Sequence, residues 1–310
     1  MTTLLFPGQG TQTPGFLHQL PVHPAVDETL AEASRTLGRP ALDYDGRSAL
    51  TSTVAVQLAA LIAGVAVARA LVAEGVAIDA VAGLSVGSYA AAVAAGALAF
   101  ADALPLVRLR ARLMEEAYPA GFGMAAFSGL SESRMAGLIS ALHDEAAPIY
   151  IANLNAPTEI VATGAVSALE RLIPLAQDAG ARRTQLLAVS VPSHCPLLAA
   201  VSQRLAAALD DIPVSAPRIT YVGNRRARAL RDAAAVKEEL ATNISHTVRW
   251  HDSMTLLHEL GERLFIEPPP GSVLTGLIEG AFRDATARSA AVTPLPTLAY
   301  LAANKGRARD

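Results

Sequence analysis

Residues 77–95 read AIDAVAGLSVGSYAAAVAA, and this stretch decides the fold. Residues 77–84 form a short apolar run typical of a buried strand. The run ends in GLSVG, a Gly-x-Ser-x-Gly turn over residues 83–87, and residues 88–95 continue in an alanine-rich helical pattern. A strand that turns sharply through a serine into a helix is the setting of a nucleophile elbow. The stretch therefore predicts an α/β fold with Ser85 at the tip of the turn.

Ser85 is a candidate nucleophile in this turn. A serine hydroxyl reacts slowly until a base removes its proton. At a tight strand-to-helix turn the hydroxyl is exposed, and the amides at the helix N-terminus point at the oxyanion that forms during attack. Gly83 and Gly87 allow the turn to close without a Cβ clash. A glycine-rich packing turn would have the same letters, but the strand before it and the helix after it favour the catalytic interpretation.

A second glycine loop follows the first apolar run of the chain. Residues 2–6 predict a strand, which leads into Gly8, Gln9 and Gly10. Two glycines leave the backbone amides free to face a ligand. We therefore expect the amide of Gln9 to join that of Val86 in an oxyanion hole, with an ordinary turn as the alternative.

The middle of the chain has a different order of predicted helices and strands from its ends. Helices are predicted for residues 54–74 and 100–116. The order strand, helix, strand, strand, helix, strand then follows, which is typical of a ferredoxin-like domain. These six elements are predicted at residues 124–129, 131–145, 149–153, 159–162, 166–179 and 184–191. We predict an α/β-hydrolase-like large domain over residues 1–122 and 190–310, with a ferredoxin-like small domain inserted over residues 123–189.

The base that activates Ser85 must be one of seven histidines. His194 follows a predicted strand in the sequence VPSH, where a loop can present it to a cleft. His251, which is followed by Asp252, is its rival. Spacing alone leaves both candidates open.

Metal and disulfide chemistry have little support in the sequence. Cys195 is the only cysteine, so the chain has neither an internal disulfide nor a cysteine-built zinc site. His246 and His251 are five residues apart, a spacing that does not place both on one helix face. We predict no metal site, and we expect Cys195 to be a small buried apolar residue.

The composition of the chain argues against several other classes of protein. Hydrophobic residues make up 52% of the chain and charged residues 17%, the balance of a compact globular protein. The net charge of -3 offers no attraction to nucleic acid. Gln57 and Arg69 interrupt the apolar run of residues 54–71, so a buried core helix is favoured over a membrane span. The N-terminus does not resemble a signal peptide, and we expect a cytoplasmic protein.

Seven motifs occur in order over nearly the whole chain. They are FPGQG at residues 6–10, GLSVG at 83–87, VRLR at 107–110 with Met114, GMAA at 123–126, NLNAP at 153–157, VPSH at 191–194 and PGSVL at 270–274. Together they resemble the malonyl-CoA:acyl carrier protein transacylases. The similarity is closest to the transacylase (epsilon) subunit of bacterial malonate decarboxylase, which also has GLSVG. The resemblance implies transfer of a malonyl group from malonyl-CoA to the thiol of an acyl carrier protein.

The resemblance also assigns roles to five residues. It implies Ser85 as the acylated nucleophile, His194 as its base, and the amides of Gln9 and Val86 as the oxyanion hole. It implies Arg110 as the partner of the malonyl carboxylate. A planar guanidinium can hold a carboxylate through two charge-assisted hydrogen bonds, and this carboxylate distinguishes malonyl from acetyl. Without the resemblance, Arg110 would be interpreted as a solvated arginine on an amphipathic helix.

The implied partners are malonyl-CoA and an acyl carrier protein, with other malonate decarboxylase subunits as a further expectation. No metal or cofactor is implied beyond the prosthetic arm of the carrier protein. A transacylase of fatty-acid or polyketide synthesis would use the same residues and is the first alternative. A serine hydrolase of the α/β type, in which His251 activates Ser85, is the second.

The chain departs from the family pattern at two positions. Leu84 stands beside the nucleophile where many relatives have histidine, and we expect an apolar residue there to change acyl selectivity. Arg249 stands where relatives often have glutamine. In the family a backbone carbonyl in this segment orients the base, so we expect the backbone at Arg249 to orient His194.

Arg225, Arg226, Arg228 and Arg231 form a local basic cluster. Charge runs usually face water, and solvation is the favoured interpretation of this one. The alternative is a contact surface for an acidic carrier protein or for a phosphate of CoA.

Overall fold

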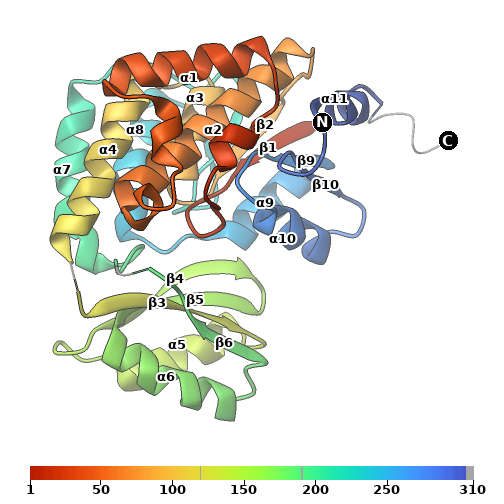
Figure 1. The fold of residues 1–310 in the computed structure, drawn as a ribbon. Coiled ribbons are helices and arrows are strands. Elements are labelled where there is room, and N and C mark those ends of the chain that lie inside the picture. Colours follow the sequence, from red (N-terminus) through yellow and green to blue (C-terminus); the bar gives the residue numbers. More distant parts are fainter. Residues whose placement is uncertain (119, 190, 305–310) are drawn as a thin grey trace.

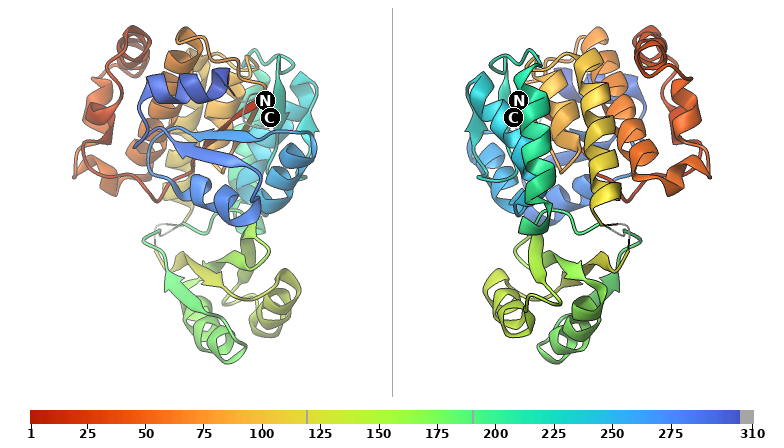
Figure 2. Two further views of the ribbon diagram at one scale, coloured as in Figure 1. Left: turned by 90° about the vertical axis from the view of Figure 1, so that its right-hand side faces the viewer. Right: turned by 90° about the vertical axis from the view of Figure 1, so that its left-hand side faces the viewer.

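The computed structural model describes residues 1–118, 120–189 and 191–304. The chain forms two β-sheets, each covered by helices and each with its own hydrophobic core. The larger part lies at the top of Figure 1, and the smaller part extends from it as a separate lobe, which both views of Figure 2 also show. The fold is α/β with a ferredoxin-like small domain, as the sequence predicted.

The large sheet contains six strands in the order β10-β9-β1-β2-β7-β8. All its pairs are parallel except β7 with β8. β1 and β2 are central neighbours, with Phe6 opposite Gly83, so the loops that follow them meet at one edge of the sheet. The strands are Thr2–Phe6 (β1), Ala80–Gly83 (β2), Thr220–Val222 (β7), Ala229–Leu230 (β8), Leu264–Glu267 (β9) and Thr286–Ser289 (β10).

Helices cover both faces of this sheet because its strands are apolar on both sides. Alternation along β1 sends Leu4 and Phe6 into one core, beside α2, and Leu5 into the other, beside α9 and α10. The helices of this part are Pro24–Leu37 (α1), Thr53–Ala73 (α2), Gly87–Ala94 (α3), Phe100–Ala117 (α4), Ala199–Asp210 (α7), Ala233–Thr242 (α8), Trp250–Glu259 (α9), Val273–Ala281 (α10) and Leu295–Ala303 (α11).

α2 has apolar residues on every side and is interrupted by Gln57 and Arg69. Within the described ranges it is the one helix long and apolar enough to cross a membrane, but 89% of its apolar window is buried inside the fold. It packs against α1, α3 and α4 at the centre of the large core. It is therefore a core helix, as predicted.

The small sheet contains four antiparallel strands in the order β4-β5-β3-β6, the topology of a ferredoxin-like domain. Its strands are Phe122–Ser128 (β3), Ile149–Ala156 (β4), Glu159–Ala165 (β5) and Arg183–Leu186 (β6), and its helices are Glu132–Leu142 (α5) and Val166–Asp178 (α6). β6 ends earlier than the predicted strand over residues 184–191. The domain boundaries at 122/123 and 189/190 stay a prediction, and residue 190 lies outside the described residues.

One edge of the small sheet is bonded to the large part. Asn153 in β4 forms a parallel bridge with Val248. The amide of Leu154 donates to the carbonyl of Val248 at 2.9 Å, and the amide of Val248 donates to Ala152 at 2.8 Å. Thr247 Oγ1 adds a bond to the carbonyl of Ile151 at 2.9 Å. These contacts hold β4 against the segment that leads into α9.

Candidate active site

The turn between β2 and α3 holds Ser85 in a strained backbone conformation. Its φ is 56°, in the left-handed region that non-glycine residues rarely adopt. Glycine is needed on both sides, because a Cβ on Gly83 would lie 2.1 Å from the carbonyl carbon of Gly87, and one on Gly87 would lie 2.2 Å from the carbonyl oxygen of Phe6. The turn therefore packs directly on the end of β1, with Ser85 at its tip.

Asn224, two residues after β7, holds this turn through two side-chain hydrogen bonds. Its Oδ1 accepts the amide of Ser85 at 2.9 Å, and its Nδ2 donates to the carbonyl of Gly83 at 2.6 Å. The backbone amide of Asn224 donates to Glu239, a buried residue whose carboxyl pKa is raised by burial. One side chain thus bonds to both the start and the tip of the turn.

His194 approaches Ser85 from the loop that follows the small domain. The Ser85 hydroxyl donates to His194 Nε2 at 2.8 Å, and His194 Nδ1 donates to the backbone carbonyl of Asn243 at 2.8 Å. Because Nδ1 carries the proton bound by this carbonyl, Nε2 is free to accept one. His194 also has a left-handed backbone, with a φ of 65°, and its amide donates to the carbonyl of Ile244 at 2.7 Å.

The carbonyl that orients His194 belongs to Asn243, and the prediction of Arg249 is wrong. The carbonyl of Arg249 accepts both the amide and the hydroxyl of Ser253 at the start of α9. Its position at the N-terminus of a helix commits it to helical bonding. The short 3-10 helix Asn243–Ser245, six residues earlier, turns a carbonyl toward the imidazole instead.

The environment of His194 keeps its imidazole neutral. Burial, and after it the charge of Arg110, lowers the pKa of His194 from 6.5 to about 4. The residue is 3% exposed, so little water reaches the ring. At pH 7 the ring therefore carries one proton, on Nδ1, and Nε2 can take another from Ser85.

The loop of Gly8 and Gln9 lies directly beside the turn. A Cβ on Gly8 would lie 2.9 Å from Leu84 Cδ2 and 3.7 Å from Ser85 Cβ. Among the described residues, the amides of Gln9 and Val86 have no hydrogen-bond acceptor. The two glycine loops predicted from the sequence are thus brought together, and the role of the two amides as an oxyanion hole stays a prediction. Leu84 packs against this loop, and its effect on selectivity stays a prediction.

Arg110 reaches the same hydroxyl from α4. It is 1% exposed, and its Nη2 donates to Ser85 Oγ at 3.1 Å. Its Nη1 donates to Gln57 Oε1 on α2. Burial lowers the pKa of Arg110 from 12.5 to about 10, so the guanidinium stays charged at pH 7. The predicted arginine therefore lies inside the site and not on a solvated helix face.

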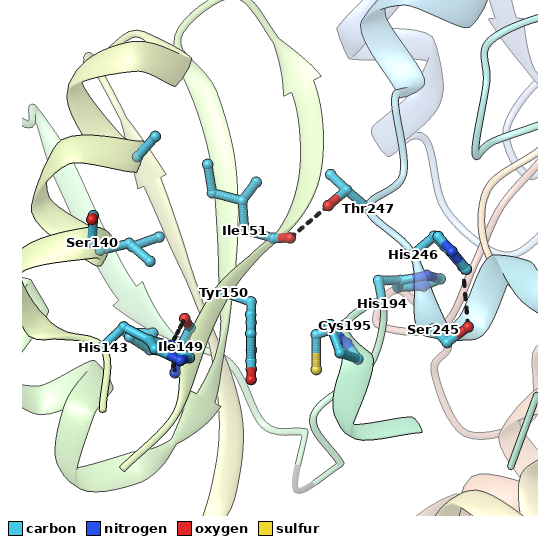
Figure 3. Close-up of a pocket in the computed structure, with 13 residues that line it drawn as sticks. Ser140, His143, Ile149, Tyr150, Ile151, His194, Cys195, Ser245, His246 and Thr247 are labelled. Carbon is cyan, nitrogen blue, oxygen red and sulfur yellow. Dashed lines mark hydrogen bonds between the residues drawn. The ribbon is translucent and has the colours of Figure 1, made fainter. Parts of the chain in front are cut away.

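A pocket of about 560 Å³ lies beside His194, between α5 and β4 of the small part and residues 194–196 and 245–247 of the large part. Figure 3 shows the side chains of α5 and β4 facing His194 and Cys195 across this space. Ser85 and Arg110 are not among its lining residues. The lining residues are Ala136, Ile139, Ser140, His143, Ile149, Tyr150, Ile151, His194, Cys195, Pro196, Ser245, His246 and Thr247.

The rival base lies elsewhere. His251 stacks on Phe282 with the ring centroids 6.3 Å apart, and Asp252 pairs with Arg249 at 2.6 Å. Within the described part of the chain, neither is bonded to Ser85. The structure therefore brings His194, and not His251, to the nucleophile.

Cys195 and part of the basic cluster have contacts of their own, and a role of the cluster in binding a carrier protein or CoA stays a prediction. Cys195 is buried, and burial raises the pKa of its thiol to about 12. Arg225 and Arg226 both pair with Glu238, at 2.8 Å and 3.1 Å, which neutralises part of the basic cluster. The described residues contain no group of three or more potential metal ligands.

Three residues contribute to the site although the sequence did not mark them as site residues. Asn224 and Asn243 contribute through contacts more than 100 residues from Ser85, and no local pattern marks them. Gln57 carried a usable signal, because it is a polar side chain in the apolar α2 and is nevertheless fully buried. A buried polar residue needs a partner, which here is Arg110.

The fold and the converging serine, histidine and arginine place the chain in the class of α/β acyltransferases. Residues 3–299 match the acyl transferase domain, and the chain belongs to this family. The malonyl CoA-acyl carrier protein transacylase of Salmonella typhimurium is 38% identical over 305 residues, covering 93% of this chain and 98% of that protein.

Two solved structures are similarly close. The acyl-carrier-protein S-malonyltransferase of Burkholderia pseudomallei is 35% identical with a TM-score of 0.92, covering 97% of this chain and 99% of that one. A malonyl-transacylase in complex with its type II polyketide-synthase acyl-carrier protein is 32% identical with a TM-score of 0.91, covering 98% and 99%.

Proposed function

We propose that this chain transfers a malonyl group from malonyl-CoA to the thiol of an acyl carrier protein through a malonyl-serine intermediate. One observation carries the proposal: the Ser85 hydroxyl lies 2.8 Å from a neutral imidazole, His194, and 3.1 Å from a buried guanidinium, Arg110. The imidazole suits activation of a serine, and the guanidinium suits a carboxylated acyl group. Relatives that match nearly the whole chain carry this activity in their names.

In the first half-reaction, Ser85 Oγ attacks the thioester carbonyl carbon of malonyl-CoA while His194 Nε2 takes its proton. The amides of Gln9 and Val86 donate to the tetrahedral oxyanion. The carbon–sulfur bond then breaks, His194 returns the proton to the sulfur, and CoA leaves. Arg110 binds the malonyl carboxylate and fixes the acyl group during the attack.

The second half-reaction runs the same chemistry with another thiol. His194 takes the proton of the carrier-protein thiol, the sulfur attacks the serine ester, and the proton passes to Ser85 Oγ as the ester bond breaks. The pocket of about 560 Å³ beside His194 offers room for the prosthetic arm that bears this thiol. The product is malonyl-carrier protein, and the enzyme returns to its starting state.

The acceptor is best sought among carrier proteins of fatty-acid or polyketide synthesis. The relatives named above support this choice, one of them through its complex with a polyketide-synthase carrier protein. A more specific expectation is that the chain is the transacylase subunit of a malonate decarboxylase, and only the GLSVG resemblance supports it. Assays with carrier proteins from each type of system separate these possibilities, because docking to the carrier is specific.

The proposal is tested by intact-protein mass spectrometry after mixing with malonyl-CoA. We expect a malonyl adduct that peptide mapping assigns to Ser85 and that disappears when an acyl carrier protein is added. Ser85→Ala should form no adduct. Rapid release of free malonate without any transfer to the thiol would instead identify a serine hydrolase.

The choice of base is tested with two histidine variants. His194→Ala should slow adduct formation by roughly 100-fold or more, the contribution of a general base. His251→Ala is the control, since His251 is also on the large domain but stacks on Phe282. Full acylation of the His194 variant would overturn the assignment.

A further inference from the structure

Arg110 is a buried cation with only neutral partners. Its guanidinium bonds to Gln57 Oε1, to Met114 Sδ at 3.4 Å and to Ser85 Oγ at 3.1 Å. Its Nε is buried and has no partner. Throughout the described residues, no carboxylate pairs with it. A buried charge is ordinarily compensated by an opposite one, so this site holds an uncompensated positive charge.

Gln57 fixes this arrangement from α2. It is fully buried, and its amide has two ends with different partners. Nε2 donates to Met114 Sδ at 3.2 Å, and Oε1 accepts from Arg110. Because a guanidinium has donors only, the oxygen must face Arg110, and the Met114 sulfur, a weak acceptor, fits the donor end. Gln57 therefore supplies an acceptor without supplying a charge.

We propose that Gln57 determines acyl selectivity: it holds Arg110 in place without cancelling its charge, so that the entering acyl group must bring the missing carboxylate. This inference rests on the proposed malonyl transfer. A carboxylate at position 57 would occupy almost the same volume and accept the same hydrogen bond. It would also neutralise Arg110 from inside the protein and remove the advantage of malonyl over acetyl.

The contacts of Arg110 extend the consequence to the chemical step. Its Nη2 donates to Ser85 Oγ, the atom that donates to His194. A guanidinium without a counterion opposes positive charge on the imidazole, and a substrate carboxylate relieves this opposition. A carboxylated acyl group thus neutralises Arg110 and makes it easier for His194 to take a proton. An acetyl group has no carboxylate, so it leaves Arg110 without a counterion beside His194. An internal carboxylate should give acetyl-CoA the same relief.

Two variants separate charge from positioning. Gln57→Glu keeps the acceptor and adds a charge, while Gln57→Met removes the acceptor and adds none. We expect Gln57→Glu to lower the ratio of malonyl to acetyl kcat/KM by roughly 10- to 100-fold, with acetyl transfer rising in absolute terms. Gln57→Met should lower the ratio less than Gln57→Glu does, and it should not raise acetyl transfer.

The opposite pattern would overturn the inference. If Gln57 only positions Arg110, Gln57→Glu keeps the ratio and Gln57→Met lowers it. The unmodified chain is measured beside them with malonyl-CoA: if it forms no malonyl-serine, the proposed function itself fails, and if it does, the ratio decides the inference alone. Circular dichroism confirms that each variant is folded.

Met114 offers the same test from a second helix, should the buried Gln57→Glu variant fail to fold. Met114 Sδ lies 3.4 Å from Arg110 Nη1 on the next turn of α4. Met114→Glu adds a carboxylate beside the guanidinium, and Met114→Gln is its neutral match. The inference expects a lower malonyl-to-acetyl ratio for Met114→Glu than for Met114→Gln, and equal ratios would contradict it.

Discussion

Ser85 and His194 share an unusual backbone geometry. Both have positive φ, 56° and 65°, although neither is glycine. Such conformations cost on the order of 1–3 kcal/mol and persist only where surrounding contacts enforce them. Asn224 enforces the first through the amide of Ser85, and Ile244 the second through the amide of His194. Two of the three non-glycine residues with positive φ in the described chain, the third being Ala227, are thus the two whose side chains must meet.

The pH dependence of acylation follows from the environment of His194. Burial, and then Arg110, lowers its pKa to about 4. The unprotonated base therefore persists in the free enzyme well below pH 6.5, and we expect kcat/KM for malonyl-CoA to have no acid limb near pH 6.5. Stopped-flow measurement of CoA release between about pH 5 and pH 8 checks this.

The same shift affects stability in a definite direction. Since the folded pKa lies below the unfolded value of 6.5, the unfolded chain binds the proton first as the pH falls. The contribution of neutral His194 to the free energy of unfolding is present above pH 6.5 and is lost as the pH falls toward 4. In the measurement of kcat/KM against pH, an acid limb at pH 6–7 would contradict the buried environment assigned to His194.

Arg110 is expected to control selectivity and not simple turnover. Arg110→Ala should lower kcat/KM for malonyl-CoA by roughly 100-fold and should not lower that for acetyl-CoA, since only malonyl has a carboxylate to lose. Arg112→Ala is the matched control on the same helix, because Arg112 is exposed and pairs with Glu116. Equal losses for both substrates would mean that Arg110 is structural.

At the scale of elements, the elbow depends on how closely β1, β2 and α3 approach. Gly87→Ala would place a methyl group 2.2 Å from the Phe6 carbonyl oxygen and 2.9 Å from that of Pro7. We expect a loss of about 1–3 kcal/mol in the free energy of unfolding, with slower acylation because the Gln9 loop must move. Urea denaturation and adduct formation measure the two effects.

Gly137→Ala is the control for this substitution. Gly137 lies within α5, is exposed, and a Cβ there would have nothing within 4 Å. Alanine should stabilise this helix by up to about 1 kcal/mol and leave acylation unchanged. Similar behaviour of the two variants would contradict the close packing assigned to the elbow.

At the scale of the whole molecule, one segment serves both domains. Residues 243–248 provide the carbonyl that orients His194 and the backbone that bonds to β4. The position of the small domain is thus connected to the position of the base. A change at this junction should affect stability and catalysis together.

Thr247→Val tests this junction by removing the hydroxyl that donates to the Ile151 carbonyl. We expect a loss of about 1 kcal/mol in the free energy of unfolding and faster amide exchange over residues 151–154. Thr255→Val is the control, since the Thr255 hydroxyl bonds to His251 within α9. Hydrogen exchange read by mass spectrometry should distinguish the two, and unchanged protection in Thr247→Val would contradict a junction at this point.

Much of the fold was predictable because its signals are local. The strand, turn and helix around Ser85 follow from apolar periodicity and two glycines, and the ferredoxin-like order follows from alternating patterns between residues 122 and 186. The ends of β6 and β2 were predicted less well, because pairing partners decide where a strand ends.

For the site, the sequence by itself determined Ser85 and narrowed the base to a few histidines, and the resemblance to a family favoured His194 and Arg110. Only the tertiary structure decided that His194 meets Ser85, that Asn243 and not Arg249 provides its carbonyl, and that Gln57 holds Arg110. The physical reason is that elements are specified by neighbours along the chain, whereas hydrogen bonds between distant loops and the burial of charge exist only once the chain has folded.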